Sequence, residues 1–370
     1  MRIYLDNNAT TPIHPDVLEV LGRSLSEVFG NASSIHKEGQ AARRRIEEAR
    51  ESVAALIGAA AREVVFTSGG TESNNAAIFG TVTAPERLHI VTTAIEHPSV
   101  LEPVAELERR GVAVTRVLPS RDGVVEADRV IDALRPETRL VSMMLANNET
   151  GVVQPVAEVA PVARERGIHV HCDAVQAAGK IDIDVEALGI DTLALSAHKL
   201  HAPKGVGALY VRKSAALRSH IVGGAQERRR RAGTENVPLA VAFGVAAELA
   251  RDPAPRARVR ELRDAFETRL RERLDIEING GSVARVPNTS NVLFRGGDAE
   301  GIVIALDLEG VAASTGSACS SGRVEPSHVL LAMGLTPDEA RSSVRFSLSR
   351  FTTAEEVGRV VEVLAGIANR

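Results

Sequence analysis

The segment IHVHCDAVQAAGKIDIDVEALGIDTLALSA, residues 168–197, decides the fold, because it contains two β-rich runs joined by a long connection. The runs IHVHCD and DTLALSA are typical of strands, since apolar and β-branched residues dominate them. The residues between them, 174–189, are enough for a crossover connection, whereas antiparallel strands need only a short turn. The segment therefore predicts two neighbouring parallel strands, with Asp173 and Lys199 at their carboxyl ends.

The same pattern extends over residues 63–212, where further β-rich runs are EVVFT, LHIVTT, VAVTRV, RLVSMML and GVGALYV. Two segments repeat apolar residues at helical spacing: Ala42, Ile46, Ala49 and Val53 in one, and Val100, Val104 and Leu107 in the other. Alternation of strands and helices predicts an α/β fold. We expect a large domain, residues 16–252, with a mostly parallel sheet flanked by helices.

The pattern changes near Pro253. Two helical patterns follow, and then fewer strands, TSNVLF and SVRFSLS, mixed with helices. We expect a smaller α+β domain formed by residues 253–370 together with residues 1–15. A loop of about residues 314–334 belongs to this smaller domain.

Composition and length indicate a folded protein of the cytoplasm. The 370 residues suffice for a large core, and 44% apolar with 25% charged residues is ordinary for globular domains. No apolar stretch approaches a membrane span, and the start, MRIYLDNNATTP, lacks the apolar run of a signal peptide. Two cysteines, Cys172 and Cys319, cannot form a disulfide framework. We expect no contact with a membrane.

Nucleic acid is not an expected partner. The net charge of −4 gives no general attraction to a polyanion. The one basic run, residues 228–231, has no interleaved aromatic residues, which favours a solvated loop over a nucleic-acid patch.

Polar residues follow several predicted strands, at the edge where open α/β sheets bind ligands. SGGTESNN, after EVVFT, suits a phosphate at a helix start, although a plain helix start explains it equally well. SAHKLHAPKG, after DTLAL, places Lys199 beside Asp173. Pyridoxal phosphate needs such a pair, a lysine for the Schiff base and an acid that keeps the pyridine nitrogen protonated. The pattern therefore predicts a pyridoxal phosphate site.

The run HVHCD leaves a second interpretation open. Alternation places His169, His171 and Asp173 on one strand face, where they could ligate the metal of a metal-dependent hydrolase. No other His, Asp or Glu group in the chain has a recognisable ligand spacing, so we favour the cofactor site. We expect Cys172, on the other face, to be a packed core thiol.

The run STGSACSSG, residues 314–322, sets Cys319 among small, turn-forming residues. Structural cysteines pack among apolar neighbours instead, and loops often carry function. Exposure alone does not make a thiol reactive, so an incidental surface thiol remains an alternative.

Ten motifs in order carry a family resemblance along essentially the whole chain: YLDNNATTP, GNASSIH, FTSGGTESNN, EHPSV, NNETG, CDAVQ, SAHKLHAPKGVGALYVR, RAGTENV, GSACSSG and VRFSLSR. They resemble the motifs of cysteine desulfurases of the NifS/IscS group. These are fold-type I pyridoxal-phosphate enzymes, often called class V aminotransferases.

The resemblance implies roles for individual residues. The implied cofactor-binding residues are Gly70, Thr71, His97, Asn148, Asp173, Gln176, Ser196, His198, Lys199 and Thr234. In the family pattern, Lys199 forms the Schiff base, Asp173 faces the ring nitrogen, Gln176 donates to the phenolic oxygen and His97 stacks on the ring. The phosphate ligands would be Gly70, Thr71, Ser196 and His198, joined by Thr234 from the other subunit of a homodimer. The implied substrate-binding residues are Arg345, Asn148 and Asn31, with Arg345 clamping a carboxylate.

The implied activity is removal of sulfur from L-cysteine, giving L-alanine and a persulfide on Cys319. The sulfur would pass to an acceptor protein for iron–sulfur cluster assembly or other sulfur transfer. Catalysis would rest on Cys319, Lys199 and His97, the last as our hypothesised acceptor of the thiol proton, since a free thiol has a pKa of about 8.5. Members that serve an iron–sulfur scaffold often have a longer tail than this chain, so the acceptor stays open. The alternatives are a selenocysteine lyase or aminotransferase of the same family and a non-catalytic scaffold.

Overall fold

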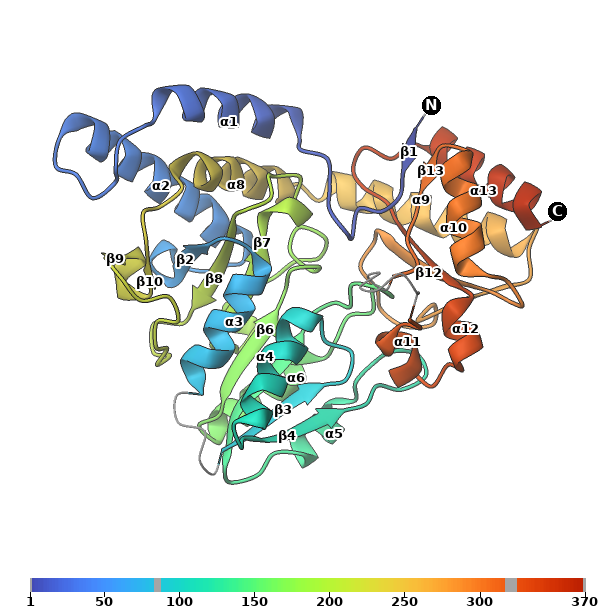
Figure 1. The fold of residues 1–370 in the computed structure, drawn as a ribbon, viewed down its shortest axis with the longest axis horizontal. Helices are drawn as coiled ribbons and strands as arrows, with labels where there is room; N and C mark the ends of the chain where they lie inside the picture. The colour runs from blue at the N-terminus through green and yellow to red at the C-terminus, as the bar shows by residue number, and fades with distance from the viewer. Residues whose placement is uncertain (1, 83–87, 317–324, 369–370) are drawn as a thin grey trace.

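The computed structural model describes residues 2–82, 88–316 and 325–368 (Figure 1). Its central element is a seven-stranded sheet in the order β2-β8-β7-β6-β5-β3-β4. The strands are β2 (Val64–Thr67), β3 (His89–Thr93), β4 (Ala113–Val117), β5 (Thr138–Met144), β6 (His169–Asp173), β7 (Thr192–Ser196) and β8 (Gly207–Val211). All seven expected strands are thus confirmed. Only β8 runs antiparallel to its neighbours within this sheet.

Strands β6 and β7 are parallel neighbours, as expected from the long connection between them. Asp173 lies opposite Ala194 in the register, so the two strands end at the same edge of the sheet. A short 3-10 helix, η2 (Ala197–Lys199), follows β7 directly. This order brings Lys199 next to the end of β6.

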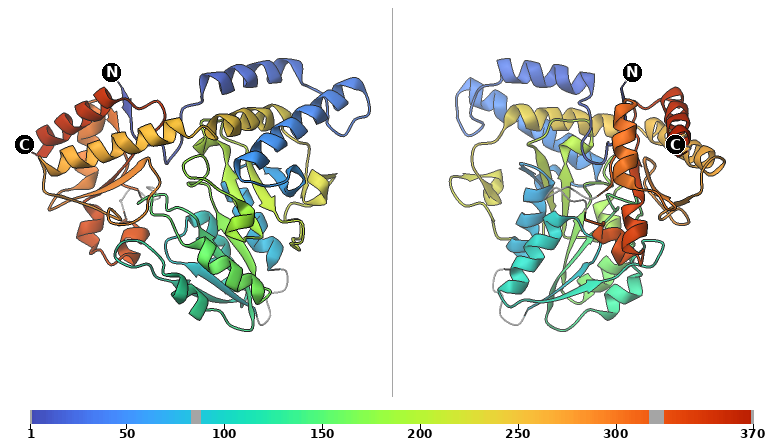
Figure 2. Two further views of the ribbon diagram at one scale, coloured as in Figure 1. Left: turned by 180° about the vertical axis from the view of Figure 1, so that it is seen from behind. Right: turned by 45° about the vertical axis from the view of Figure 1, so that its right-hand side comes forward.

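Helices cover both faces of the sheet, because apolar residues alternate along the strands between the two sides. On β2, Val64 and Phe66 pack into one core cluster and Val65 into another. One face is covered by α3 (Gly70–Thr81) and α4 (Pro98–Arg109), and the other by α2 (Lys37–Leu56), α6 (Val156–Glu165) and α8 (Val237–Ala250) (Figures 1 and 2). The two predicted helical repeats are confirmed in α2 and α4, where all their apolar residues are buried.

Shorter elements complete this part of the chain. They are α1 (Pro15–Glu27), η1 (Ala61–Glu63), α5 (Ala127–Asp132), α7 (Val185–Leu188), β9 (Ala225–Gln226), η3 (Glu227–Arg229) and β10 (Arg231–Ala232). Helix α1 packs along α8. Among the described residues, no helix combines the length and apolar character needed to cross a bilayer.

The rest of the chain forms an antiparallel sheet, in the order β11-β12-β14, with helices packed on it. Its elements are α9 (Ala254–Arg271), β11 (Ile276–Ile278), β12 (Thr289–Phe294), α10 (Ala299–Leu308), β13 (Val311–Ala312), α11 (His328–Ala332), α12 (Pro337–Arg341), β14 (Ser343–Ser347) and α13 (Ala354–Ala368). The first strand, β1 (Ile3–Tyr4), pairs with β13, and Ile3 and Leu5 pack into the same core cluster as this sheet. Helix α11 packs against the larger core instead. The domain bounds at residues 15 and 253 stay a proposal.

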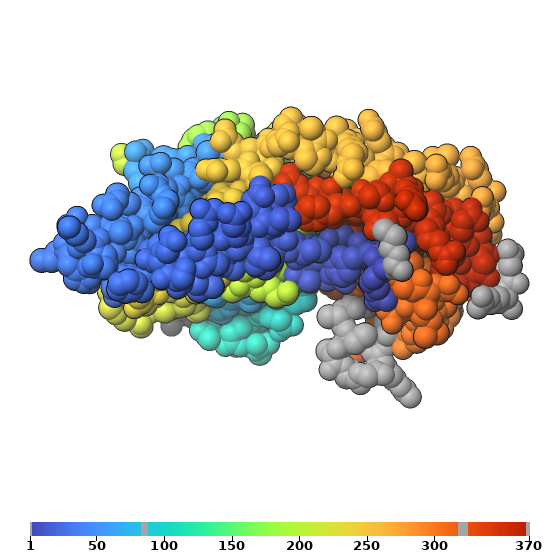
Figure 3. All heavy atoms as spheres, turned by 90° about the horizontal axis from the view of Figure 1, so that it is seen from above, coloured from blue at the N-terminus to red at the C-terminus, as the bar shows by residue number. Residues whose placement is uncertain are grey.

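The segment after β1 spans the two sheets. Asp6 forms a bridge with Ser347 of β14, whereas the amide of Thr11 donates to the His198 carbonyl after β7, at 3.2 Å. Seen from above, this segment, in dark blue, lies beside the red C-terminal part of the chain (Figure 3). It forms one wall of the site described next.

Candidate active site

A cavity of about 380 Å³ lies at the carboxyl ends of the central strands, between the two sheets. Its size falls in the range of small-molecule and cofactor sites. Most of the residues expected from the sequence line it: Gly70, Thr71, His97, Asn148, Asp173, Gln176, Ser196, His198, Lys199 and Arg345. The topology thus brings together groups that are far apart in the chain.

Lys199 projects into this cavity from η2. Its Nζ donates to the carbonyl oxygens of Asn8, at 2.5 Å, and Ala9, at 2.8 Å. Burial, reinforced by the positive charge of Arg345, lowers the pKa of Lys199 to about 8, although Asp6 and Asp173 oppose the shift. Roughly a tenth of this amine is therefore neutral at pH 7, far more than for an ordinary lysine, and the neutral amine is the form that attacks a carbonyl carbon.

Asp173 ends β6 with both carboxylate oxygens engaged. Oδ1 accepts from the amide of Val175 at 2.9 Å, and Oδ2 accepts from Nδ2 of Asn74 at 2.7 Å. The side chain is only 6% exposed. The carboxylate is therefore held in one orientation at the edge of the cavity, where it can face a protonated ring nitrogen.

The amino end of α3 supplies a place for an anion. Gly69, which precedes the helix, makes no side-chain cap, so within the described part of the chain the first amides of this twelve-residue helix lack a capping side chain and can bind a ligand. A Cβ atom at Gly70 would lie 2.7 Å from Cγ2 of Val175, so a side chain there would fill this end of the cavity. Ser196 and His198 line the same cavity. Burial lowers the pKa of His198 to about 4, so its ring is neutral at pH 7.

Asn8 connects the amines of the site. Its carbonyl accepts from Lys199 and, at 2.9 Å, from Nε2 of Gln176. Its side-chain oxygen accepts from Nζ of Lys180 at 3.1 Å, and Lys180 also donates to Oε1 of Gln176 at 2.5 Å. These bonds fix the Gln176 amide with its nitrogen as the donor and its oxygen as the acceptor.

His97 caps the amino end of α4. Its Nδ1 accepts from the amide of Ser99 at 3.0 Å and lies 2.8 Å from the Ser99 hydroxyl. Burial lowers the pKa of His97. The neutral ring therefore carries its proton on Nε2, and a further proton can enter only at Nδ1, where these bonds must break.

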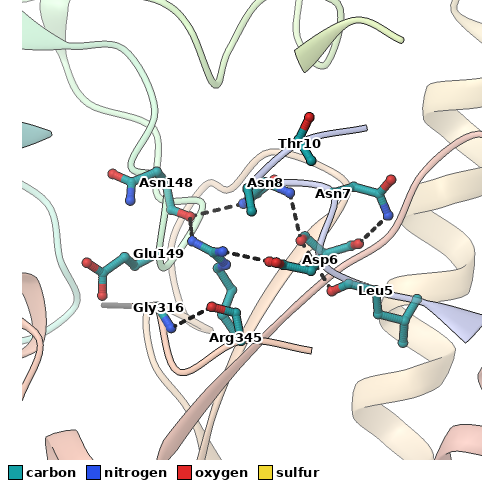
Figure 4. Close-up of polar contacts among 12 residues, drawn as sticks. Leu5, Asp6, Asn7, Asn8, Thr10, Asn148, Glu149, Gly316 and Arg345 are labelled. Carbon is teal, nitrogen blue, oxygen red and sulfur yellow. Dashed lines mark hydrogen bonds and ion pairs between the residues drawn. The ribbon is translucent and has the colours of Figure 1, made fainter. Parts of the chain in front are cut away.

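Arg345 lies on β14 with its guanidinium inside the protein, 5% exposed (Figure 4). Nη2 pairs with Oδ1 of Asp6 at 2.8 Å, and Nη1 donates to the Asn148 carbonyl at 3.2 Å. Nε is buried without a partner among the described residues. The neighbouring residues of the strand, Val344 and Phe346, face the core, as the alternation predicts. Arg345 lines the cavity, and a guanidinium at a cavity wall is suited to a carboxylate.

Cys319 lies outside the described residues, so its expected position is not tested. The residues on both sides of the undescribed stretch are placed by the structure. Ser314 pairs with Arg345, and Ser314 and Gly316 line the cavity. On the other side, the Ser327 hydroxyl donates to Oε2 of the buried Glu149 at 2.5 Å. Burial raises the pKa of Glu149.

Two expected residues do not reach the cavity within this chain. Thr234 and Asn31 line a separate hollow, together with Phe29. The family resemblance assigns Thr234 to the site of the other subunit, and this stays a prediction. The nearby basic run is partly paired, since Arg231 forms an ion pair with Glu72 at 3.0 Å.

The histidines of β6, which the sequence left open as metal ligands, form hydrogen bonds to neighbouring side chains. His171 bonds to Thr192 through Nδ1 and to Asn74 through Nε2, both at 3.0 Å, and His169 also bonds to Thr192. Within the described ranges, no three His, Cys, Asp or Glu groups are placed to hold a metal ion. The expectation for Cys172 is confirmed: it is fully buried, and burial raises the pKa of its thiol.

Sequence reasoning missed three residues of the site. Asp6 and Asn8 lie in the quoted motif YLDNNATTP, but nothing in their spacing relates them to Arg345 or Lys199. Asn74 could have been found, because it lies one helical turn after Gly70 and so shares its face of α3.

Comparisons with known proteins agree with this geometry. The family model described as aminotransferase class-V matches residues 3–360. A cysteine desulfurase from Nostoc sp. is 48% identical over 372 residues, which cover 100% of this chain and 93% of that protein.

Two solved structures have the same fold. A NifS-like protein superposes with a TM-score of 0.93 at 36% identity, covering 100% of both chains. A structure of SspA in complex with cysteine has a TM-score of 0.85 at 39% identity, covering 95% of this chain and 100% of that one. The architecture is that of fold-type I pyridoxal-phosphate enzymes. This chain belongs to the class-V aminotransferase family, and its similarity to cysteine desulfurases extends along its whole length.

Proposed function

We propose that this chain is an L-cysteine desulfurase, which uses pyridoxal phosphate to convert L-cysteine into L-alanine and a persulfide on Cys319. The observation that carries the proposal is the meeting of Lys199, Asp173 and Arg345 around one cavity. The amine of Lys199, with its lowered pKa, suits the cofactor aldehyde, and the oriented carboxylate of Asp173 suits the ring nitrogen. The buried guanidinium of Arg345 suits the carboxylate of an amino acid. Full-length similarity to cysteine desulfurases supports the same reading.

The cavity fits the cofactor at both ends. Asp173 would face the ring nitrogen, Gln176 would donate to the ring oxygen, and His97 would stack on the ring. The phosphate would lie at the start of α3, on Gly70 and Thr71, near the groups of Ser196 and His198. When bound, the cofactor acts as an electron sink that acidifies the substrate's α-carbon.

The protein's own groups do the rest. Lys199 would bind the cofactor and then, as a neutral amine, take the α-proton of the substrate; the carbonyls of Asn8 and Ala9 hold its ammonium form. Arg345 would bind the substrate carboxylate and so fix which bond of the α-carbon faces Lys199. Asn148 would line the substrate side.

Cys319 would act as a thiolate on the substrate sulfur. A sulfur–sulfur bond forms as the carbon–sulfur bond breaks, and the electron pair of the broken bond stays with the carbon skeleton, which is protonated to alanine. His97 remains our hypothesised acceptor of the thiol proton. In this structure that role requires Nδ1 to give up its bonds to Ser99.

We also propose a homodimer in which Thr234, and with it the hollow near Asn31, contributes to the partner's cofactor site. Apolar side chains in this region support an interface: Phe29 is 80% exposed and Ile35 90% exposed. Leu18 and Leu25 of α1 are also largely exposed. Large apolar side chains that stay exposed in a single chain are typical of an interaction site when they form a patch, and these four lie within residues 18–35. The protein would work in the cytoplasm and pass its sulfur to an acceptor protein, such as an iron–sulfur scaffold.

The test is alanine production by the cofactor-loaded full chain given L-cysteine. We expect alanine from the wild type and none from Lys199→Ala, whereas Lys213→Ala, on the surface after β8, should behave like the wild type. Absence of alanine from cofactor-loaded wild type would refute the proposal.

A further inference from the structure

A buried chain of hydrogen bonds connects Asp173 to Asn74 and His171, which do not line the cavity and have no role in the proposed reaction. It begins at Asn74 of α3, whose Nδ2 is 2.7 Å from Oδ2 of Asp173 and 2.8 Å from the Ser99 hydroxyl. Oδ1 of Asn74 is 3.0 Å from Nε2 of His171. Asn74 and His171 are both fully buried, so each of these bonds is made away from water.

The direction of every bond follows from Asp173. An ionised carboxylate only accepts hydrogen bonds, so the nitrogen of the Asn74 amide must face it and the oxygen must face His171. His171 therefore carries its proton on Nε2. Its Nδ1 must then accept from the hydroxyl of Thr192, which is 3.0 Å away.

A second branch leads from the same amide to His97. The Ser99 oxygen accepts from Nδ2 of Asn74, so its own proton is free to point at Nδ1 of His97, 2.8 Å away. The Asn74 amide thus contacts Asp173, which is expected to face the ring nitrogen of the cofactor. Through the Ser99 hydroxyl it also contacts His97, which is expected to stack on the ring. Burial lowers the pKa of His171 to about 3, which keeps its ring neutral at working pH.

We propose that Asn74, held by the Nε2 proton of His171, is a positioning residue that orients both Asp173 and, through Ser99, the ring of His97 for the cofactor. This inference rests on the proposed function, because it needs the cofactor in this cavity. His171 acts only through Asn74, since it does not line the cavity.

The first test needs no variant. Nitrogen NMR of the full chain with labelled histidine reports the tautomer of each ring. We expect the His171 ring to be in the Nε2–H form and to show no titration across the neutral range. An Nδ1–H form would mean that the amide of Asn74 points the other way, and it would overturn the proposal.

The second test is cofactor affinity of Asn74→Ala, measured by absorbance titration with pyridoxal phosphate. Loss of a hydrogen bond to a charged group predicts about tenfold weaker binding or more. Asn75→Ala is the matched control, because Asn75 follows directly on α3 and donates to the Thr71 carbonyl instead. A folded Asn74→Ala protein with wild-type affinity would overturn the proposal.

Failure of the proposed function looks different. In that case wild type and Asn75→Ala would make no alanine, whereas the tautomer of His171 and the effect of Asn74→Ala on cofactor affinity would still be measurable.

Discussion

Replacing Arg345 by lysine keeps the positive charge and removes the planar guanidinium. In the structure, Nη2 of this group pairs with Asp6 and Nη1 donates to the Asn148 carbonyl, whereas Nε has no partner among the described residues. The side chain is 5% exposed. A lysine ammonium is a single point of charge and cannot serve both partners and a substrate carboxylate.

The expected decrease in kcat/KM can be estimated from the loss of one charge-assisted hydrogen bond to the substrate carboxylate. Such a bond contributes about 1.5–3 kcal/mol, which corresponds to roughly a 10- to 100-fold lower kcat/KM for L-cysteine in Arg345→Lys. Most of the change should fall on KM, because the carboxylate does not react. Steady-state alanine production gives both constants.

Two controls isolate the carboxylate. Arg341→Lys makes the same change four residues upstream, at a half-exposed side chain that pairs with Asp338 on the surface, and should leave both constants unchanged. Cysteamine, which is L-cysteine without the carboxylate, should compete equally well with both proteins. An unchanged KM in a folded Arg345→Lys variant would refute the assignment of Arg345 to the substrate carboxylate.

Three further predictions follow from other parts of the structure. Cofactor uptake should speed up as pH rises through about 8, because the lowered pKa of Lys199 makes its amine neutral above that value; a rapid-mixing absorbance experiment giving a midpoint near the ordinary 10.5 would contradict it. Phe29→Asp should halve the molar mass measured by light scattering, since Phe29 is 80% exposed in the single chain and we place it in a dimer interface; a dimer of unchanged stability would argue against that interface. Glu227→Gln should lower the free energy of unfolding by about 3 kcal/mol, since it leaves the buried Arg50 with only the half-exposed Glu47, at 3.3 Å, as an anion. Urea denaturation measures this loss, and Glu48→Gln, in a surface pair, should cost almost nothing.

Much of the fold could be predicted because its signals are local. Strand and helix periodicity, together with the long connection between β6 and β7, identified neighbouring parallel strands and hence the meeting of Asp173 with Lys199. The handedness and adjacency rules of such units need no knowledge of the rest of the chain. Burial of Cys172 followed from the same alternation.

The groups that tune the site could not be predicted, because they come from distant segments. The carbonyl of Asn8 contacts Lys199, which lies 191 residues later in the chain. Asp6 meets Arg345 because β1 pairs with β13 and Asp6 itself bridges Ser347 of β14. No local pattern encodes either contact. The tautomer of His97 likewise depends on how the chain turns into α4, where Ser99 supplies two donors.

The proposed dimer explains why Thr234 does not line the cavity of a single chain. The family resemblance assigns Thr234 to the site of the other subunit, so a single chain would not bring it into its own cavity. The geometry of one chain leaves Thr234 in a separate hollow beside exposed apolar residues.

The most direct test of the central claim is the mass of the intact protein after incubation with L-cysteine in the absence of reductant. The account predicts that the wild type gains one or more sulfur atoms, located on the peptide that contains Cys319, while alanine appears in the same sample. The buried Cys172 should stay unmodified, and Cys319→Ser should gain no sulfur. Alanine formed equally by wild type and Cys319→Ser, with no sulfur added to either, would contradict the account.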